Sequence, residues 1–307
     1  MAAPVNLTTT AQFSTSIREV DFVTQFQKNW DALRTIMGIM RPIRKAPGTK
    51  LTSYKATVDG GLQGGASVAE GDDIPLTKTK VEPVAYGDIT IEKYAKAVSI
   101  EAVAKYGATV AVERTDTAFR NELQKKVLGD FYTFLKTGTL KGTQKTWQRA
   151  LAIAKGAVLK RFANDNLDVT EVIGFANIMD FYDWLGDKEI TVQTQFGLTY
   201  VENFLGYSTL FLLPDNYIEQ KQVIAVPREN IDLYYIDPAD SEFAKLGLTY
   251  TVAGETNLIG FHAEGNYKNA TGETYAIMGM KLWAEYLDGI AVVTVGSSNV
   301  EPVNSPE

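Results

Sequence analysis

The chain has 307 residues, of which 45% are hydrophobic and 22% charged, a balance typical of one large or two smaller globular domains. The absence of cysteine excludes disulfides and thiol chemistry, and the single histidine excludes a zinc site built from several histidines. The formal net charge of −7 argues against a dedicated nucleic-acid binder, and no apolar run is long enough to span a membrane.

Residues 1–15 are small, polar and uncharged, so we expect an arm that becomes ordered only on a partner. A helix and an elbow are predicted over residues 16–48. Ser16 and Glu19 have the spacing of a capping box, and Gly38 and Pro42 end the helix. Its apolar residues recur every three or four positions and predict one buried face: Val20, Val23, Phe26, Trp30, Leu33 and Met37.

Residues 49–86 predict two extended arms joined by a glycine-rich, acidic tip. The arms contain few residues that could fill a core, and an isolated two-stranded ribbon is marginal in water. A loop of this length in a compact domain is usually functional, so we expect it to lie on another molecule. If that molecule is a second copy of the chain, the protein is an assembly subunit. The candidate assembly residues of this loop are Tyr54, Gly60, Gly61, Gly64, Gly65, Glu70, Gly71, Asp72, Asp73, Ile74 and Pro75.

A strand and a long helix are predicted over residues 87–140. Ile89 and Ile91 alternate with polar residues in the strand at 88–100. The helix spans about 116–137, with Gly138 predicted as its C-terminal cap. The apolar face of this helix is the second candidate assembly element, and it comprises Phe119, Leu123, Val127, Phe131 and Phe134.

Beyond a boundary near 137–144, helices and strands are mixed, so the predicted class is α+β. Helices are expected at 147–162 and 178–186, and residues 237–274 are expected to be rich in loops. The expected strands span 172–176, 207–213, 222–226, 231–236, 257–263, 278–288 and 290–295, and a polar tail follows.

This order of elements resembles the major capsid proteins of tailed bacteriophages, which share the HK97-type fold. VAEGDDIP at 68–75 is similar to the acidic signature on the family's extended loop, the E-loop. The helix at 111–138 stands where the family has its spine helix. The stretches 196–212 and 222–236 are similar to strands of the family's axial domain.

The resemblance covers residues 13–296 and implies a division of the chain. The implied segments are an N-terminal arm (1–15), a helix and elbow (16–48), an E-loop (49–86), a peripheral domain with the spine helix (87–140), an axial domain (141–236), a return to the peripheral domain (237–288), and a final axial strand and tail (289–307).

The implied function is that of a structural shell protein and not of an enzyme. Pentamers and hexamers of the chain would form an icosahedral virion shell, assembled in the bacterial cytoplasm, around double-stranded DNA that is enclosed without sequence-specific binding. The implied partners are a portal, decoration proteins and a separate scaffolding protein, because the arm begins almost at once. The alternative is an encapsulin-type compartment that encloses enzymes.

Other functional interpretations of the residues are weaker, and we predict no catalytic, cofactor or metal site. The glycine-rich stretch at 60–66 lacks the Lys-Ser/Thr of a phosphate loop. Carboxylates at the tip and the basic stretch after the first helix are typical of solvated surface, although a cation site and a nucleic-acid site stay open. Lys50 and Lys55 could form intersubunit crosslinks, but no partner asparagine is evident, and His262 in an apolar stretch favours a structural role. An enzyme of unknown chemistry is the third hypothesis.

Overall fold

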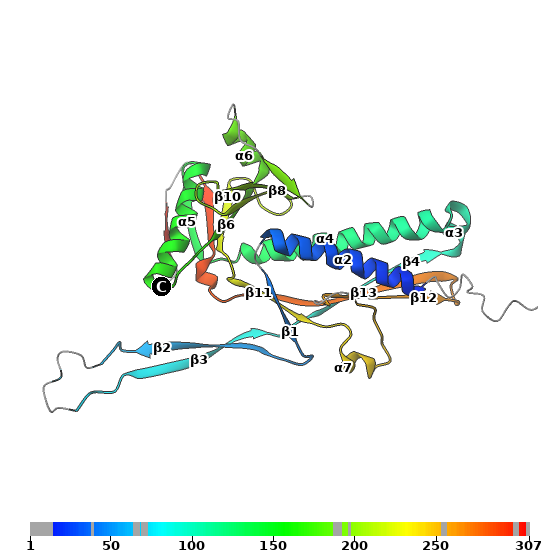
Figure 1. Ribbon diagram of the computed structural model, residues 1–307, viewed down its shortest axis with the longest axis horizontal. Coiled ribbons are helices and arrows are strands. Elements are labelled where there is room, and N and C mark those ends of the chain that lie inside the picture. The colour runs from blue at the N-terminus through cyan, green and yellow to red at the C-terminus, as the bar shows by residue number, and fades with distance from the viewer. Residues whose placement is uncertain are drawn as a thin grey trace, which may run out of the picture.

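The computed structural model describes residues 15–37, 40–63, 68, 73–186, 192–195, 198–252, 257–296 and 301–304. The predicted arm at 1–15 lies outside this part of the chain except for Thr15. The described strands form a five-stranded sheet, an eight-stranded sheet and a separate two-stranded ribbon (Figure 1).

The five-stranded sheet is built around β13, the longest strand. Its antiparallel partners are β4, β11 and β12, and β1 adds to β11 in parallel. Helices α2 and α4 lie side by side over this sheet (Figure 1). The elements are α2 (Thr15–Met37), β1 (Arg41–Lys45), β4 (Ile91–Ser99), α3 (Ile100–Tyr106), a π-helical turn (Thr109–Glu113), α4 (Arg114–Leu135), β11 (Ile231–Ile236), α7 (Ser241–Ala244), β12 (Ile259–Asn266) and β13 (Thr271–Ala284).

Helix α2 was predicted correctly, but the capping box at its start is wrong. The helix already begins at Thr15, and Glu19 is buried rather than folded back onto the first turn. Its carboxylate accepts hydrogen bonds from the backbone N–H of Ala263 (2.6 Å) and the hydroxyl of Thr251 (2.7 Å). Glu19 therefore fixes α2 to the strand beneath it.

The apolar face of α2 also differs from the prediction by two positions at its start. Val20 is 51% exposed, whereas Phe22 is 2% exposed and stacks on Phe261 of β12 with 4.0 Å between ring centroids. Val23, Phe26 and Trp30 are buried as predicted, and the side chains of Leu33 and Met37 lie outside the described part of the structure.

Residues 41–45 of the basic stretch after α2 form strand β1 rather than a loop, and Arg41 and Arg44 stay half-exposed there. Arg41 pairs with Asp232 at 2.9 Å, and Arg44 lies 3.3 Å from both Asp237 and Asp240. These arginines pair with acidic groups on the neighbouring strand and just after it. Carboxylates of the chain itself therefore occupy the place that the phosphates of a nucleic acid would take.

Helix α4 has the predicted apolar face, but Gly138 does not cap it. The glycine donates its N–H to the carbonyl of Leu135, and its φ is not among the positive values. A side chain here would place Cβ 2.6 Å from the backbone oxygen of Ile290. A glycine is needed at 138 because the chain passes close to the backbone of Ile290 there. The sequence analysis did not predict the short helix α3, which precedes α4.

The eight-stranded sheet has the order β15-β5-β14-β10-β6-β9-β8-β7. Helices α5 and α6 were predicted correctly, and Thr146 and Asn177 cap their N-termini. Strands β5 and β15 were missed, and β5 occupies the predicted boundary at 137–144. The elements are β5 (Leu140–Gln144), α5 (Trp147–Asn164), β6 (Val172–Asn177), α6 (Ile178–Leu185), β7 (Gln193–Gln195), β8 (Leu198–Glu202), β9 (Thr209–Leu213), β10 (Gln222–Pro227), a 3-10 turn (Leu287–Gly289), β14 (Ala291–Val295) and β15 (Glu301–Asn304).

Two predictions for the later part of the chain need correction. The resemblance places residues 231–236 in the axial domain (141–236), together with the strands of the eight-stranded sheet. In the structure these residues form β11, which pairs with β1 and β13 in the five-stranded sheet. The region 237–274 is less rich in loops than predicted, because β12 runs to Asn266 and β13 begins at Thr271. None of the helices in the described part of the chain could cross a membrane.

Candidate functional site

The candidate site is the ribbon formed by β2 (Leu51–Asp59) and β3 (Lys78–Gly87). These two strands pair with each other in antiparallel fashion and with no other described strand. The ribbon extends away from the two sheets as a long arm (Figure 1). Strands that leave their outer edges unpaired are templates for another chain, so this arm is a natural contact element.

The ribbon has one apolar and one charged face. Residues directly opposite each other share a face, and the register places Tyr54 opposite Pro83 and Val58 opposite Thr79, with Val81 between them. Tyr54, Val58 and Val81 are 70%, 46% and 58% exposed. Three bulky apolar side chains therefore lie on one side of an arm that buries none of them fully.

The other face of the ribbon has ion pairs. Asp59 lies opposite Lys78, with 3.0 Å between carboxylate and ammonium, and Lys80 lies 2.5 Å from Glu82. All four side chains are exposed, so each pair contributes little to stability. Their value is that they keep this face hydrated, which leaves the opposite face as the one suited to burial.

The end of the ribbon adds more exposed apolar surface. Leu62, Ile74 and Leu76 are 86%, 75% and 93% exposed. Gly60 and Gly61 have φ of 77° and 75°, which side chains other than hydrogen disfavour, and they reverse the chain after β2. Of the other predicted residues, Asp73 and Pro75 are exposed, and Gly64, Gly65, Glu70, Gly71 and Asp72 lie outside the described residues.

The predicted assembly residues include Tyr54 and Ile74 of this exposed apolar surface but not four others that belong to it: Val58, Leu62, Leu76 and Val81. Alternation within each strand was visible in the sequence. That alternation places Tyr54 and Val58 on one face, but only the register between the strands, which the sequence does not show, places Val81 on the same face.

The predicted assembly role of the α4 face stays a prediction, and within the subunit this face is largely buried. Leu123, Val127 and Phe131 are 3%, 5% and 0% exposed, and Phe119 and Phe134 are partly buried against the same core. Phe131 lies edge-on to Phe175, with 6.0 Å between ring centroids. These residues hold α4 within the subunit and present little surface to another one.

A cluster of charged groups ties α2, α4 and β4 together. The carboxylate of Asp116 accepts hydrogen bonds from Arg18 at 2.5 and 2.8 Å and lies 2.5 Å from the ammonium of Lys96. Burial alone would raise the pKa of Asp116, but the hydrogen bonds and charges of Arg18 and Lys96 outweigh it and lower that pKa. Asp116 is thus held as a carboxylate that joins two helices to the sheet.

His262 lies in β12 between two carboxylates, 3.6 Å from Glu19 and 3.8 Å from Glu264. Its ring stands edge-on to Tyr250 with 6.5 Å between centroids. These contacts fit the structural role predicted for it. Across the described residues, no cluster of three or more histidine and acidic groups is suited to hold a metal ion.

No family model and no curated protein matches the sequence. Solved structures do match. A chain of the mature capsid of bacteriophage PhiM1 superposes with a TM-score of 0.53 and 7% identity, covering 85% of this chain and 87% of that chain. The capsid of cyanophage P-SCSP1u gives a TM-score of 0.52 and 8% identity, covering 84% and 87%.

A shell of another kind matches equally well. The SrpI encapsulin of Synechococcus elongatus PCC 7942 superposes with a TM-score of 0.52 and 11% identity, covering 87% of this chain and 89% of that chain. The chain therefore has the HK97-type fold, which phage major capsid proteins and encapsulins share.

Proposed function

We propose that this chain is the major capsid protein of a tailed bacteriophage, assembling as pentamers and hexamers into an icosahedral shell around double-stranded DNA. The observation that carries the proposal is the two-faced ribbon, whose apolar side chains Tyr54, Val58 and Val81 stay 46–70% exposed in the described subunit. The two phage capsids among the structures of similar fold also support the proposal.

In this proposal the β2–β3 ribbon is the E-loop and lies on the neighbouring subunit. Its apolar face (Tyr54, Val58, Val81) contacts the neighbour, and its charged face (Asp59, Lys78, Lys80, Glu82) stays in water. The same chain must fit both pentamers and hexamers, so the angle between the ribbon and the neighbouring subunit differs between the two rings. The left-handed glycines at 60 and 61 allow the tip to adjust.

The two sheets correspond to the two domains of such a subunit. The five-stranded sheet with α2 and α4 is the peripheral domain, with α4 as its spine helix. The eight-stranded sheet with α5 and α6 is the axial domain, which surrounds the symmetry axes. A closed shell forms because contacts between unlike surfaces of identical chains repeat around axes that close.

The partners follow from this role. A separate scaffolding protein directs assembly, a portal occupies one vertex, and decoration proteins bind the outer surface. The mature protein resides in the virion, after assembly in the host cytoplasm. The wall encloses DNA without reading its sequence, which suits a chain with a net charge of −7.

The second candidate is an encapsulin-type compartment, favoured by the match to the SrpI encapsulin at the same TM-score as a phage capsid. The two functions differ in what the shell holds. A phage shell contains nuclease-protected DNA, whereas an encapsulin contains cargo protein.

The test is negative-stain electron microscopy of the chain expressed alone and with its neighbouring genes. Closed polyhedral particles support a shell subunit. Particles filled with nuclease-protected DNA in the phage context support a capsid, and particles filled with a co-purifying protein support the compartment. Monomers under every salt, concentration and co-expression condition would refute both.

A further inference from the structure

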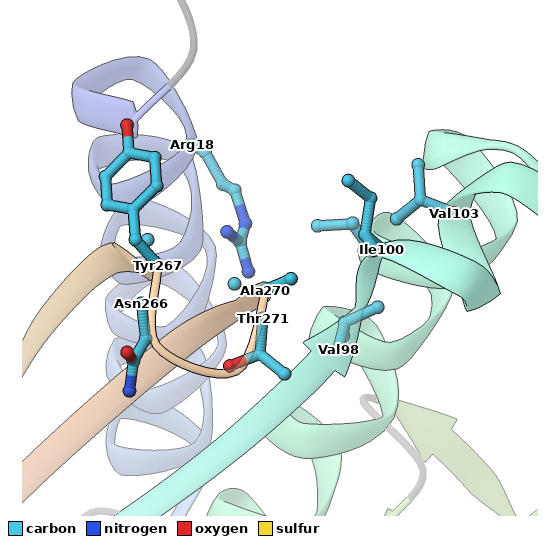
Figure 2. Close-up of a pocket in the computed structure, with 11 residues that line it drawn as sticks. Arg18, Val98, Ile100, Val103, Asn266, Tyr267, Ala270 and Thr271 are labelled. Atoms are coloured by element: carbon cyan, nitrogen blue, oxygen red, sulfur yellow. The ribbon is translucent and has the colours of Figure 1, made fainter.

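A pocket of about 390 Å³ lies where the first turn of α2, the end of β4, α3 and the β12–β13 turn meet (Figure 2). Its lining includes four aliphatic side chains, those of Val98, Ile100, Val103 and Val112. Ile100 is 60% exposed, and Tyr267 at the rim is fully exposed. The subunit thus leaves an apolar hollow open to water at one end of the five-stranded sheet.

The pocket has one charged lining residue, Arg18, and that charge is already neutralised. Its guanidinium donates to both oxygens of Asp116 and to the hydroxyl of Thr274 at 2.9 Å. A ligand with a carboxylate or phosphate would have to compete with Asp116 for Arg18. The pocket is therefore suited to an uncharged, apolar occupant.

Residues 1–14 are uncharged and carry apolar side chains among their polar ones. This segment, MAAPVNLTTTAQFS, contains no charged side chain and includes Val5, Leu7 and Phe13. It joins α2 at Thr15, and Arg18 follows within one helical turn, a rise of about 4.5 Å. The segment thus enters the helix at the edge of the pocket.

We propose that residues 1–14 dock into this pocket on the same chain, with the aromatic ring of Phe13 as the anchor. A short tether raises the effective concentration of the segment to about the millimolar range, so modest apolar contact is enough for binding. This inference concerns the single subunit, and it holds or fails independently of the proposed shell function.

Cysteine crosslinking tests the proposal, because the chain has no native cysteine. Gln12→Cys, which leaves the proposed anchor Phe13 in place, is combined with Val103→Cys on the pocket wall and oxidised at subunit concentrations low enough to disfavour assembly. The expected product is an intrachain disulfide, detected by a mobility shift without reductant and by mass spectrometry. The matched control pairs Gln12→Cys with Leu167→Cys, a partly exposed site after α5.

The outcomes separate the possibilities. An intrachain bond at least tenfold more abundant than in the control supports docking on the same chain. An interchain bond, or yields equal to the control, overturns it. If the Val103→Cys pair does not fold, hydrogen exchange decides: deletion of residues 1–14 should speed amide exchange across residues 98–112, and unchanged exchange there overturns the proposal.

Discussion

Replacing two valines on the apolar face of the ribbon by lysine tests the proposed contact between subunits. Val58 and Val81 are 46% and 58% exposed, so about half of each side chain is available for burial on a neighbour. Full burial of an aliphatic side chain contributes about 1.5–3 kcal/mol, so the two half-exposed valines contribute roughly 2 kcal/mol per contact. Since each 1.4 kcal/mol is about tenfold in affinity, V58K/V81K should weaken each contact roughly 30-fold.

The assay measures the lowest subunit concentration at which particles form, by light scattering and electron microscopy. The control is D59N/E82Q on the charged face, which changes the net charge of −7 by the same two units in the positive direction. Its assembly threshold should stay near that of the unmodified chain. Urea unfolding of isolated subunits should differ by less than about 0.5 kcal/mol for both variants, because all four residues are exposed.

Two results would contradict the reasoning. An unchanged assembly threshold for V58K/V81K would show that the apolar face is not buried between subunits. An equal rise of the assembly threshold in both variants would show that the added positive charge weakens assembly regardless of which face of the ribbon carries it.

Further predictions concern the subunit itself. F131A should lower the free energy of unfolding by about 3–5 kcal/mol in urea titrations, because Phe131 is fully buried, and a loss below about 1 kcal/mol would contradict the core position of α4. G138A should lower the free energy of unfolding by about 1–3 kcal/mol, because its Cβ would lie 2.6 Å from Ile290. The control G129A in α4 has open space around its Cβ and should raise the free energy of unfolding by up to about 1 kcal/mol. Equal effects of the two substitutions would refute the close approach at Gly138. D116N should lower stability by about 3 kcal/mol near neutral pH, because it leaves Arg18 and Lys96 with a weaker partner. Since folding lowers the pKa of Asp116, this loss should be full above about pH 4 and shrink as the pH falls through the folded-state pKa; a loss that is constant with pH would argue against the ion pair.

Elements with a strong local pattern were predictable from the sequence. The apolar faces of α4 and α5 repeat at helical spacing, and β6 and β10 are nearly continuous apolar runs. Strands β1 and β5 are polar, and pairing with distant segments fixes them instead. Arg41 meets Asp232, 191 positions away, and β5 lies beside β14. Such contacts leave no periodicity in the local sequence.

The candidate site was predictable in its location but not in its geometry. Sequence composition identified residues 49–86 as an arm without a core of its own, and the ribbon confirms two paired strands there. The division into two faces depends on the register that pairs Tyr54 with Pro83, and a shift of one residue would exchange the faces of one strand. Glu19 illustrates the opposite error, because its spacing from Ser16 suggested a cap while its carboxylate bonds to a strand 244 positions later.

The position of β14 determines when the subunit can finish folding during synthesis. This strand ends at Val295 and lies between β5 and β10 in the interior of the eight-stranded sheet. Because a chain emerges from the ribosome with its N-terminus first, the ribbon is exposed long before this strand is available. The eight-stranded sheet therefore cannot close before residues 291–295 have left the ribosome, and until then the chain has an exposed ribbon and an incomplete sheet.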